Sequence, residues 1–314
     1  MPDRDRRGRM RLLLAASLLL AGAVVPQRSL AAACCVSAAS FGVGRLLVWE
    51  DRAFGLQLGH ARSFGQWDSQ GSLRWNGSDF SDGLTQAQAW AIVRLHDRIQ
   101  LQGWVPVVVN DRRSGPQSQV AVGLGDAGAA VRFEVWKIGE YEGLPSFAVT
   151  VGGLAPTGRR VEETSPPLFA GSTGRGAWAG TLAIEAEYAL LPWFARLDVG
   201  ATGFLPFRRT DIGVDQRYGP VLQAALSTGR ELLPDVLVAA VALTGEWEAP
   251  LELGGATVPN SSARSYTLAT SLSWRADPRW TFVGSVTNTV WPDGAGMNRD
   301  ARLGFTLGVR HGHF

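Results

Sequence analysis

Most of the chain after residue 53 alternates apolar residues with small or polar ones, with a period of two. In the segment 99–109, for example, one face reads Ile-Leu-Gly-Val-Val-Val, whereas the opposite face includes Gln100 and Gln102. A period of two indicates β-strands, whose successive side chains point to opposite faces. Twelve segments show this pattern: 54–64, 88–95, 99–109, 121–136, 145–156, 177–188, 193–206, 218–228, 236–247, 264–274, 280–290 and 301–310.

The lengths of these segments and of their connections favour a membrane barrel. Strands of soluble proteins usually have about five or six residues, whereas a tilted strand needs roughly nine to eleven to cross a bilayer. The connections alternate between long ones (65–87, 110–120, 157–176, 207–217, 248–263, 291–300) and short ones (96–98, 137–144, 189–192, 229–235, 275–279). This rhythm is typical of outer-membrane barrels. We therefore predict an all-β, transmembrane, antiparallel up-and-down β-barrel of about twelve strands over residues 54–314, with both ends in the periplasm.

The charged residues within the predicted strands gather on the face opposite the apolar one. A charge on the lipid face costs roughly 2–4 kcal/mol near the bilayer midplane, so we expect this face to line the lumen. The predicted lumenal charges are Arg94, Arg132, Glu134, Glu185, Glu187, Arg196, Asp198, Glu246 and Arg302. They have two interpretations, a charged constriction that selects permeants or an ion-pair network that fills a narrow barrel. The turn 189–192, with Tyr188 opposite Trp193, would pair Glu185 with Arg196.

The first 33 residues have the pattern of a cleaved secretory signal peptide. Five arginines precede an apolar run over residues 12–25, and Ala31-Ala32-Ala33 provides small residues for cleavage. Fourteen residues span only about 21 Å as a helix, less than a bilayer core of roughly 30 Å. The real start is Met1 or Met10. Residues 34–53 would then form an N-terminal periplasmic tail.

Cys34 and Cys35 follow this cleavage site directly. Three interpretations remain open: lipidation of Cys34, a disulfide between the two neighbours in an oxidising compartment, or two small residues in a tail. A metal site is not expected, because no third soft ligand lies nearby.

Composition narrows the classes of function. Charged residues make up 18% of the chain, below the roughly 25% of a soluble domain. Without residues 1–33 the chain keeps 24 basic and 26 acidic residues, so a nucleic-acid-binding footprint is not expected. The four histidines, at 60, 96, 311 and 313, are not predicted to converge with a nucleophile or an acid. We therefore expect no catalytic residues, no cofactor and no enzymatic activity.

Several short motifs occur in an ordered series. They are Asp97-Arg98 in a turn, Gly123-Leu124-Gly125-Asp126, Leu144-Pro145-Ser146, Pro156-Thr157-Gly158 and Gly174-Arg175-Gly176-Ala177-Trp178. In this order they resemble the transporter-like outer-membrane barrels grouped with the meta-pathway phenol-degradation family, over residues 88–314. The resemblance implies an outer-membrane channel or uptake barrel and brings no catalytic residues. One departure is that Phe314 follows Gly308, Arg310 and Gly312 at alternate positions, so either a bulge shifts the register or 311–314 is a tail.

Three functions follow as hypotheses. The first is a monomeric outer-membrane channel for a small, hydrophobic solute. The second is a closed-lumen barrel that acts as a surface-binding or structural protein, and the third is an outer-membrane lipid-modifying enzyme. In each case the expected partners are outer-membrane lipid, lipopolysaccharide and the barrel-assembly machinery. Arginines in the long loops would suit lipopolysaccharide phosphates, although solvated loops explain them as well.

Overall fold

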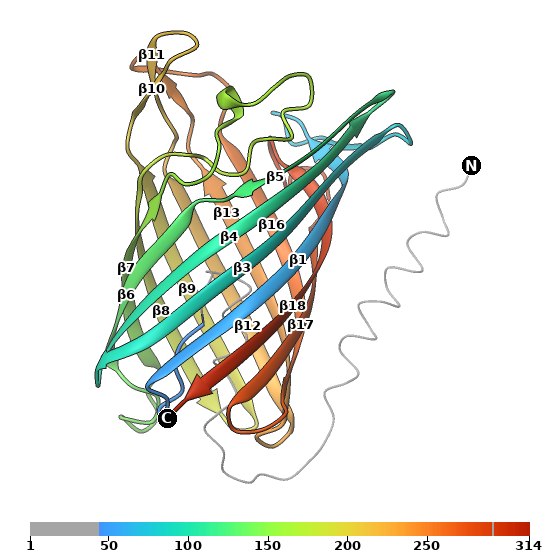
Figure 1. Ribbon diagram of the computed structural model, residues 1–314. Helices are drawn as coiled ribbons and strands as arrows, with labels where there is room; N and C mark the ends of the chain where they lie inside the picture. The colour runs from blue at the N-terminus through green and yellow to red at the C-terminus, as the bar shows by residue number, and fades with distance from the viewer. Residues whose placement is uncertain (1–43, 291) are drawn as a thin grey trace.

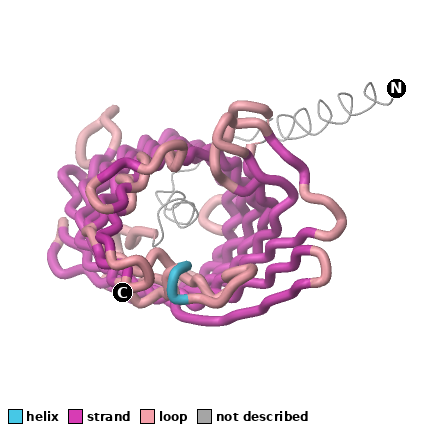
Figure 2. Tube along the Cα trace, turned by 90° about the horizontal axis from the view of Figure 1, so that it is seen from above, coloured by secondary structure: helices cyan, strands magenta, loops and turns pink. Residues whose placement is uncertain are grey.

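A computed structural model describes residues 44–290 and 292–314, which form a closed antiparallel β-barrel. The predicted signal peptide and Cys34-Cys35 lie outside the described residues. Twelve strands make up the wall in the order in which they follow along the chain: β1 (Arg52–Trp67), β3 (Phe80–His96), β4 (Ile99–Ser114), β6 (Ala127–Trp136), β7 (Ser146–Ala155), β8 (Ala179–Leu190), β9 (Trp193–Phe204), β12 (Val221–Leu233), β13 (Leu237–Glu248), β16 (Ala263–Arg275), β17 (Trp280–Thr289) and β18 (Asp300–His313). Pairing of β18 with β1 closes the ring (Figures 1 and 2).

The two ends of the barrel differ. Tight turns join β3 to β4, β8 to β9 and β16 to β17 at the end where β1 begins and β18 ends, here called the terminus end. The opposite end, here called the loop end, carries the long connections (Figure 1). These connections contain β2 (Leu73–Trp75), β5 (Gln117–Leu124), the 3-10 helix η3 (Val161–Glu163), β10 (Phe207–Arg209), β11 (Val214–Arg217), β14 (Glu252–Leu253) and β15 (Ala256–Thr257). No helix in the described ranges is both long and apolar enough to span a bilayer.

The wall has an apolar outside and a polar inside, as the alternation predicts. Leu226 on β12 is 59% exposed and Leu307 on β18 is 60% exposed, whereas Ser227 and Arg310, on the lumenal faces of the same two strands, are buried. Aromatic side chains lie exposed beside the turns of the terminus end; they are Tyr188, Trp193, Trp274 and Trp280. Trp and Tyr favour the headgroup level of a bilayer. The outer surface therefore has the character of a lipid-facing belt.

The segment predicted as one strand over 121–136 is divided into β5 and β6. Both pair with β4, but the ladder stops between Val107↔Leu124 and Trp104↔Gly128. Pro106 lies in this gap and has no N–H to donate to a ladder, so the neighbouring chain bulges out and the Gly125 amide donates to the Pro106 carbonyl. Strands β4 and β5 continue instead as a hairpin beyond the wall, where a long loop over 110–120 was predicted.

The register between β8 and β9 also differs from the prediction. Leu190 pairs with Trp193, so the turn contains two residues rather than four, and Glu187 rather than Glu185 lies opposite Arg196. The side chains at the turn do not reveal this two-residue shift, because it leaves every residue on its predicted face.

Neither explanation offered for the C-terminal residues holds. Strand β18 runs to His313 and its pairing with β1 is regular from Arg52↔His313 to Ser63↔Arg302. Gly308, Arg310 and Gly312 are therefore lumenal residues of a continuous strand, and the outer face of the same strand includes His311, which stacks on Phe54.

Candidate functional site in the lumen

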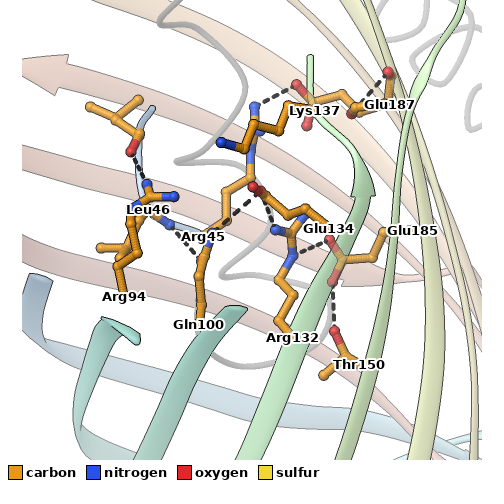
Figure 3. Close-up of polar contacts among 12 residues, drawn as sticks. Arg45, Leu46, Arg94, Gln100, Arg132, Glu134, Lys137, Thr150, Glu185 and Glu187 are labelled. Atoms are coloured by element: carbon orange, nitrogen blue, oxygen red, sulfur yellow. Dashed lines mark hydrogen bonds and ion pairs between the residues drawn. The ribbon is translucent and has the colours of Figure 1, made fainter. Parts of the chain in front are cut away.

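Six of the nine predicted lumenal charges form one buried network near the terminus end. Arg132 donates to Glu134 at 2.5 Å on β6 and to Glu185 at 3.1 Å on β8. Arg196 on β9 contacts the same Glu185 oxygen at 3.3 Å and Asp198 at 2.7 Å. Figure 3 shows Arg132 and Glu134 of β6 turned toward Glu185 of β8, on the other side of β7. The sixth member, Glu187, is described below with its partner.

The carboxylates of this network are held by partners within the barrel, whereas Nη1 of Arg196 is buried without a hydrogen-bond partner. A period of two places 132 with 134, 185 with 187, and 196 with 198 on one face, and the pairing of β6, β7, β8 and β9 brings these faces together. The Thr150 hydroxyl on β7 donates to the second Glu185 oxygen at 3.2 Å. A buried charge is tolerated when it is paired and hydrogen-bonded. The arrangement therefore fits the ion-pair network that was one of the two interpretations, and it stiffens one side of the lumen.

Residues 44–51 enter the terminus end of the barrel and contact its wall from inside. Arg45 donates to Glu187 at 2.9 Å, and the Leu46 amide donates to the Gln100 side chain at 3.2 Å (Figure 3). Glu50 is fully buried and pairs with Arg310, whose Nη1 lies 2.6 Å from Oε1 of Glu50. These residues belong to the segment predicted as a periplasmic tail, and β1 begins at Arg52 rather than at residue 54.

Apolar contacts accompany these ion pairs. Leu46 is 2% exposed and packs with Ala53, Ile92, Trp90 and Trp104 on the inner face of β1, β3 and β4. The predicted lumenal residue Arg94 holds the same segment, because it donates to the carbonyls of Leu47 at 2.7 Å and Glu50 at 3.0 Å. Arg94 therefore lies apart from the network of β6, β8 and β9.

Sequence reasoning missed Arg45, Glu50 and Arg310 as lumenal partners. One signal was present, namely an inward arginine between two inward glycines, Gly308 and Gly312. A Cβ at Gly312 would clash with the Glu50 carboxylate, so the small residue leaves room for a side chain from elsewhere in the chain.

The remaining two predicted charges lie near the loop end in separate groups. Arg302 contacts Asp300 at 2.8 Å and Asp82 at 3.4 Å. Glu246 contacts Arg299 at 2.6 Å. The loop-end charges thus do not join the network of β6, β8 and β9.

Three of the five motifs of the ordered series meet around one carboxylate at the loop end. Asp126 accepts hydrogen bonds from the amides of Gly158 at 3.0 Å, Arg175 at 2.7 Å and Gly176 at 3.3 Å. A Cβ at Gly174 would lie 2.7 Å from an Asp126 oxygen, which explains the glycine there. Three motifs that are far apart in sequence therefore form one structural junction, which we call the Asp126 junction.

The Asp126 junction folds the long connection between β7 and β8 against the mouth of the barrel. Asn110 on β4 donates to the Ala170 carbonyl at 2.8 Å, and Arg175 forms a bidentate pair with Glu248 at 2.5 and 2.8 Å. Tyr218 lies beside Arg175, and burial raises the pKa of Tyr218 to about 12, with nearby Glu162 acting in the same direction. The connection is therefore fixed by many contacts rather than left as a solvated loop.

Comparisons with known proteins agree with the fold. No protein-family model matches the chain, and no curated protein matches its sequence. Among solved structures, an outer membrane channel from Pseudomonas putida F1 has a TM-score of 0.70 and 16% identity, covering 85% of this chain and 97% of that one. The β-domain of the Bordetella autotransporter BrkA has a TM-score of 0.47 and 13% identity, covering 82% of this chain and 99% of that one.

A third structure is the CymD monoaromatic hydrocarbon channel, with a TM-score of 0.40 and 8% identity, covering 84% of this chain and 89% of that one. The likeness to the Pseudomonas channel extends over most of both chains. At this level of identity it establishes that the chain has the fold of an outer-membrane β-barrel.

Proposed function

We propose that this protein is an outer-membrane channel that takes up a small solute. The observation that carries the proposal is the two-sided wall, which places a continuous apolar belt outside and paired charges, amides and hydroxyls inside. The structural likeness to the Pseudomonas channel supports it, as does the ordered motif series that resembles the meta-pathway phenol-degradation barrels. On this proposal the terminus end faces the periplasm, and the loop end faces the outside of the cell.

Export and insertion belong to the same proposal. Residues 1–33 would be removed as a signal peptide, and the barrel would be assembled as a monomer by the barrel-assembly machinery, with outer-membrane lipid and lipopolysaccharide around it. N-terminal sequencing and intact mass of the protein from outer membranes test this directly. A chain that begins at Cys34 with a mass increase for lipid would also decide between the interpretations of that cysteine.

Conductance of the purified full chain in planar lipid bilayers tests the channel. We expect discrete current steps, because the ring is closed and the lumen is polar. The same protein heat-denatured in the same detergent is the control. Bilayers that remain silent over many reconstitutions would contradict the channel proposal.

A second candidate, the closed-lumen barrel, is favoured by one observation. Residues 44–51 lie inside the terminus end and are fixed there by two buried ion pairs, Arg45–Glu187 and Glu50–Arg310. If this segment never leaves the lumen, the barrel stays closed and the protein acts as a surface-binding or structural protein rather than as a channel. Silent bilayers for the natural chain and for variants that release the segment would favour this second function.

A further inference from the structure

One side of the lumen contains a cavity that the ion-pair network does not reach. It has a volume of about 290 Å³ and lies against the inner faces of β1, β3, β17 and β18. The polar side chains that line it are Gln57, Gln86, Gln88, Thr287 and Thr306. In the ring of strands, this side lies opposite the wall formed by β8, β9 and β12.

The cavity exists because small residues meet at its base. Gly59 on β1 is opposite Gln86 on β3 and Thr306 on β18. A Cβ at Gly59 would lie 3.3 Å from the Thr306 hydroxyl oxygen, so a larger residue would take space from the cavity. Ala61 is likewise opposite Gly304, which in turn is opposite Thr287. The register of four strands thus builds a hollow lined by these polar side chains together with Ala61 and Leu84.

The hydrogen-bonding groups around the cavity are neutral and largely unused. Gln86 donates to Gln88 at 3.3 Å. Within the described part of the chain, the side chains of Gln57, Thr287 and Thr306 have no hydrogen-bond partner. An amide offers two N–H donors and a carbonyl acceptor, and a hydroxyl offers both roles. The cavity therefore presents several donors and acceptors to its contents.

The one titratable residue among its lining groups turns away from it. His60 belongs to the outward face of β1, and its Nδ1 lies 2.9 Å from the Thr85 hydroxyl on the same outer face. No charged side chain among the described residues lines the cavity. This contrasts with the wall of β6, β8 and β9, where arginines and carboxylates are paired.

We infer that this cavity is a binding site for a small neutral solute that carries several hydroxyl or amide groups, such as a single sugar ring or a polyol. The inference rests on the proposed function and names the class of its permeant. An ion would find no opposite charge and would lose its hydration. A hydrocarbon would leave the Gln57 amide and the hydroxyls of Thr287 and Thr306 facing it without partners, which is the situation that binding sites discriminate against most strongly. The volume is close to the lower limit of about 300 Å³ for ligand sites and suits one small molecule.

The site can be tested by saturation-transfer NMR on the detergent-solubilised full chain with D-xylose as the probe. We expect a xylose signal for the natural protein, and no competition from an excess of glutamate or toluene. The paired change Gln57→Leu and Gln88→Leu is expected to weaken xylose binding by about tenfold, because each lost neutral hydrogen bond lowers affinity by a factor of a few. Gln223→Leu on β12, separated from β17 by β13 and β16, is the matched control and is expected to bind as the natural protein does.

Two additions keep the test decisive. Thr306→Val is nearly isosteric and removes one hydroxyl, so it is expected to weaken xylose binding by a few-fold even if the double glutamine variant does not fold. Absence of a xylose signal, an unchanged signal in both Gln57→Leu/Gln88→Leu and Thr306→Val, or displacement of xylose by toluene would overturn the site. Conductance is measured separately: a conducting barrel that does not bind xylose overturns only this inference, whereas a silent barrel that binds xylose overturns only the channel.

Discussion

Glu185 is the residue on which the buried network depends, because it is shared by two arginines. Arg132 and Arg196 both contact its Oε2 oxygen, at 3.1 and 3.3 Å. Removing one partner of a buried ion pair leaves an uncompensated charge and typically costs about 3–5 kcal/mol. Both arginines keep a second carboxylate, Glu134 and Asp198 respectively, so the loss is expected at the lower end of that range.

We therefore expect Glu185→Gln to lower the free energy of unfolding by about 3 kcal/mol. Combining it with Arg196→Met should cost less than the sum of the two single changes, because the two side chains interact directly. Urea titration of the barrel in detergent, followed by tryptophan fluorescence, measures all three. Additive losses would show that Glu185 and Arg196 are not coupled. In bilayers, unchanged ion selectivity of the double variant would identify the network as structural filling.

At the loop end, Asp126 plays a comparable role for the backbone. Its carboxylate accepts three amides from two segments of the connection between β7 and β8. Asp126→Asn replaces one acceptor oxygen by a donor, and an unsatisfied group costs about 1–3 kcal/mol. We expect trypsin to cleave at Arg159, Arg160 or Arg175 about tenfold faster in this variant. Asp79→Asn, in an exposed loop, is the control, and equal cleavage rates in both variants would be inconsistent with the Asp126 junction.

Among the elements, residues 44–51 have the most direct consequence for function. Their hold on the wall includes two ion pairs, the hydrogen bonds with Arg94 and Gln100 described above, and the packing of Leu46. The combined change Arg45→Ala and Glu50→Gln removes the two ion pairs without changing a residue of the barrel wall. We expect the conductance of single channels to rise severalfold, since the segment then leaves the lumen more often. Arg52→Ala, at the exposed start of β1, should conduct as the natural chain does; equal conductance in both variants would show that the segment does not limit the current.

The elements also show what the sequence predicts and what it does not. Alternation identifies each of the twelve wall strands, because the face of a residue depends only on its own position along the strand. The break at Pro106, the two-residue turn after Leu190 and the position of Glu50 depend on partners elsewhere. The break at Pro106 can be predicted only if β4 is known to pair with two successive segments, β5 and β6. The position of Glu50 depends on its pairing with Arg310, which is 260 residues away in the sequence. The predicted lumenal face was therefore available from the sequence, whereas the pairing within it and the contribution of the N-terminal segment were not.

In the molecule as a whole, the lumen is divided by chemistry. The wall of β6, β8 and β9 carries buried, paired charges. The wall of β17, β18, β1 and β3 carries amides and hydroxyls around a cavity, between the Arg302–Asp82 pair at the loop end and the Arg310–Glu50 pair at the terminus end. The charged wall keeps its shape because its charges hold one another, while the neutral stretch around the cavity keeps hydrogen-bonding groups available. The lumen thus combines a rigid wall, formed by β6, β8 and β9, with a wall that can bind a solute, formed by β17, β18, β1 and β3. A uniformly charged pore would not provide this combination.

The identity of the outer medium can be tested with a single pair of substitutions on one strand. Leu226 lies near the middle of β12 and is 59% exposed on the outer face, whereas Gln223 belongs to the lumenal face of the same strand. If the belt faces lipid, Leu226→Arg places a charge in hydrocarbon and should lower the free energy of unfolding in phospholipid vesicles by about 2–4 kcal/mol. Gln223→Arg keeps its charge in the polar lumen and should cost less. In water an exposed Leu→Arg change would be nearly neutral, so equal small effects of the two substitutions would mean that water, and not lipid, surrounds the barrel.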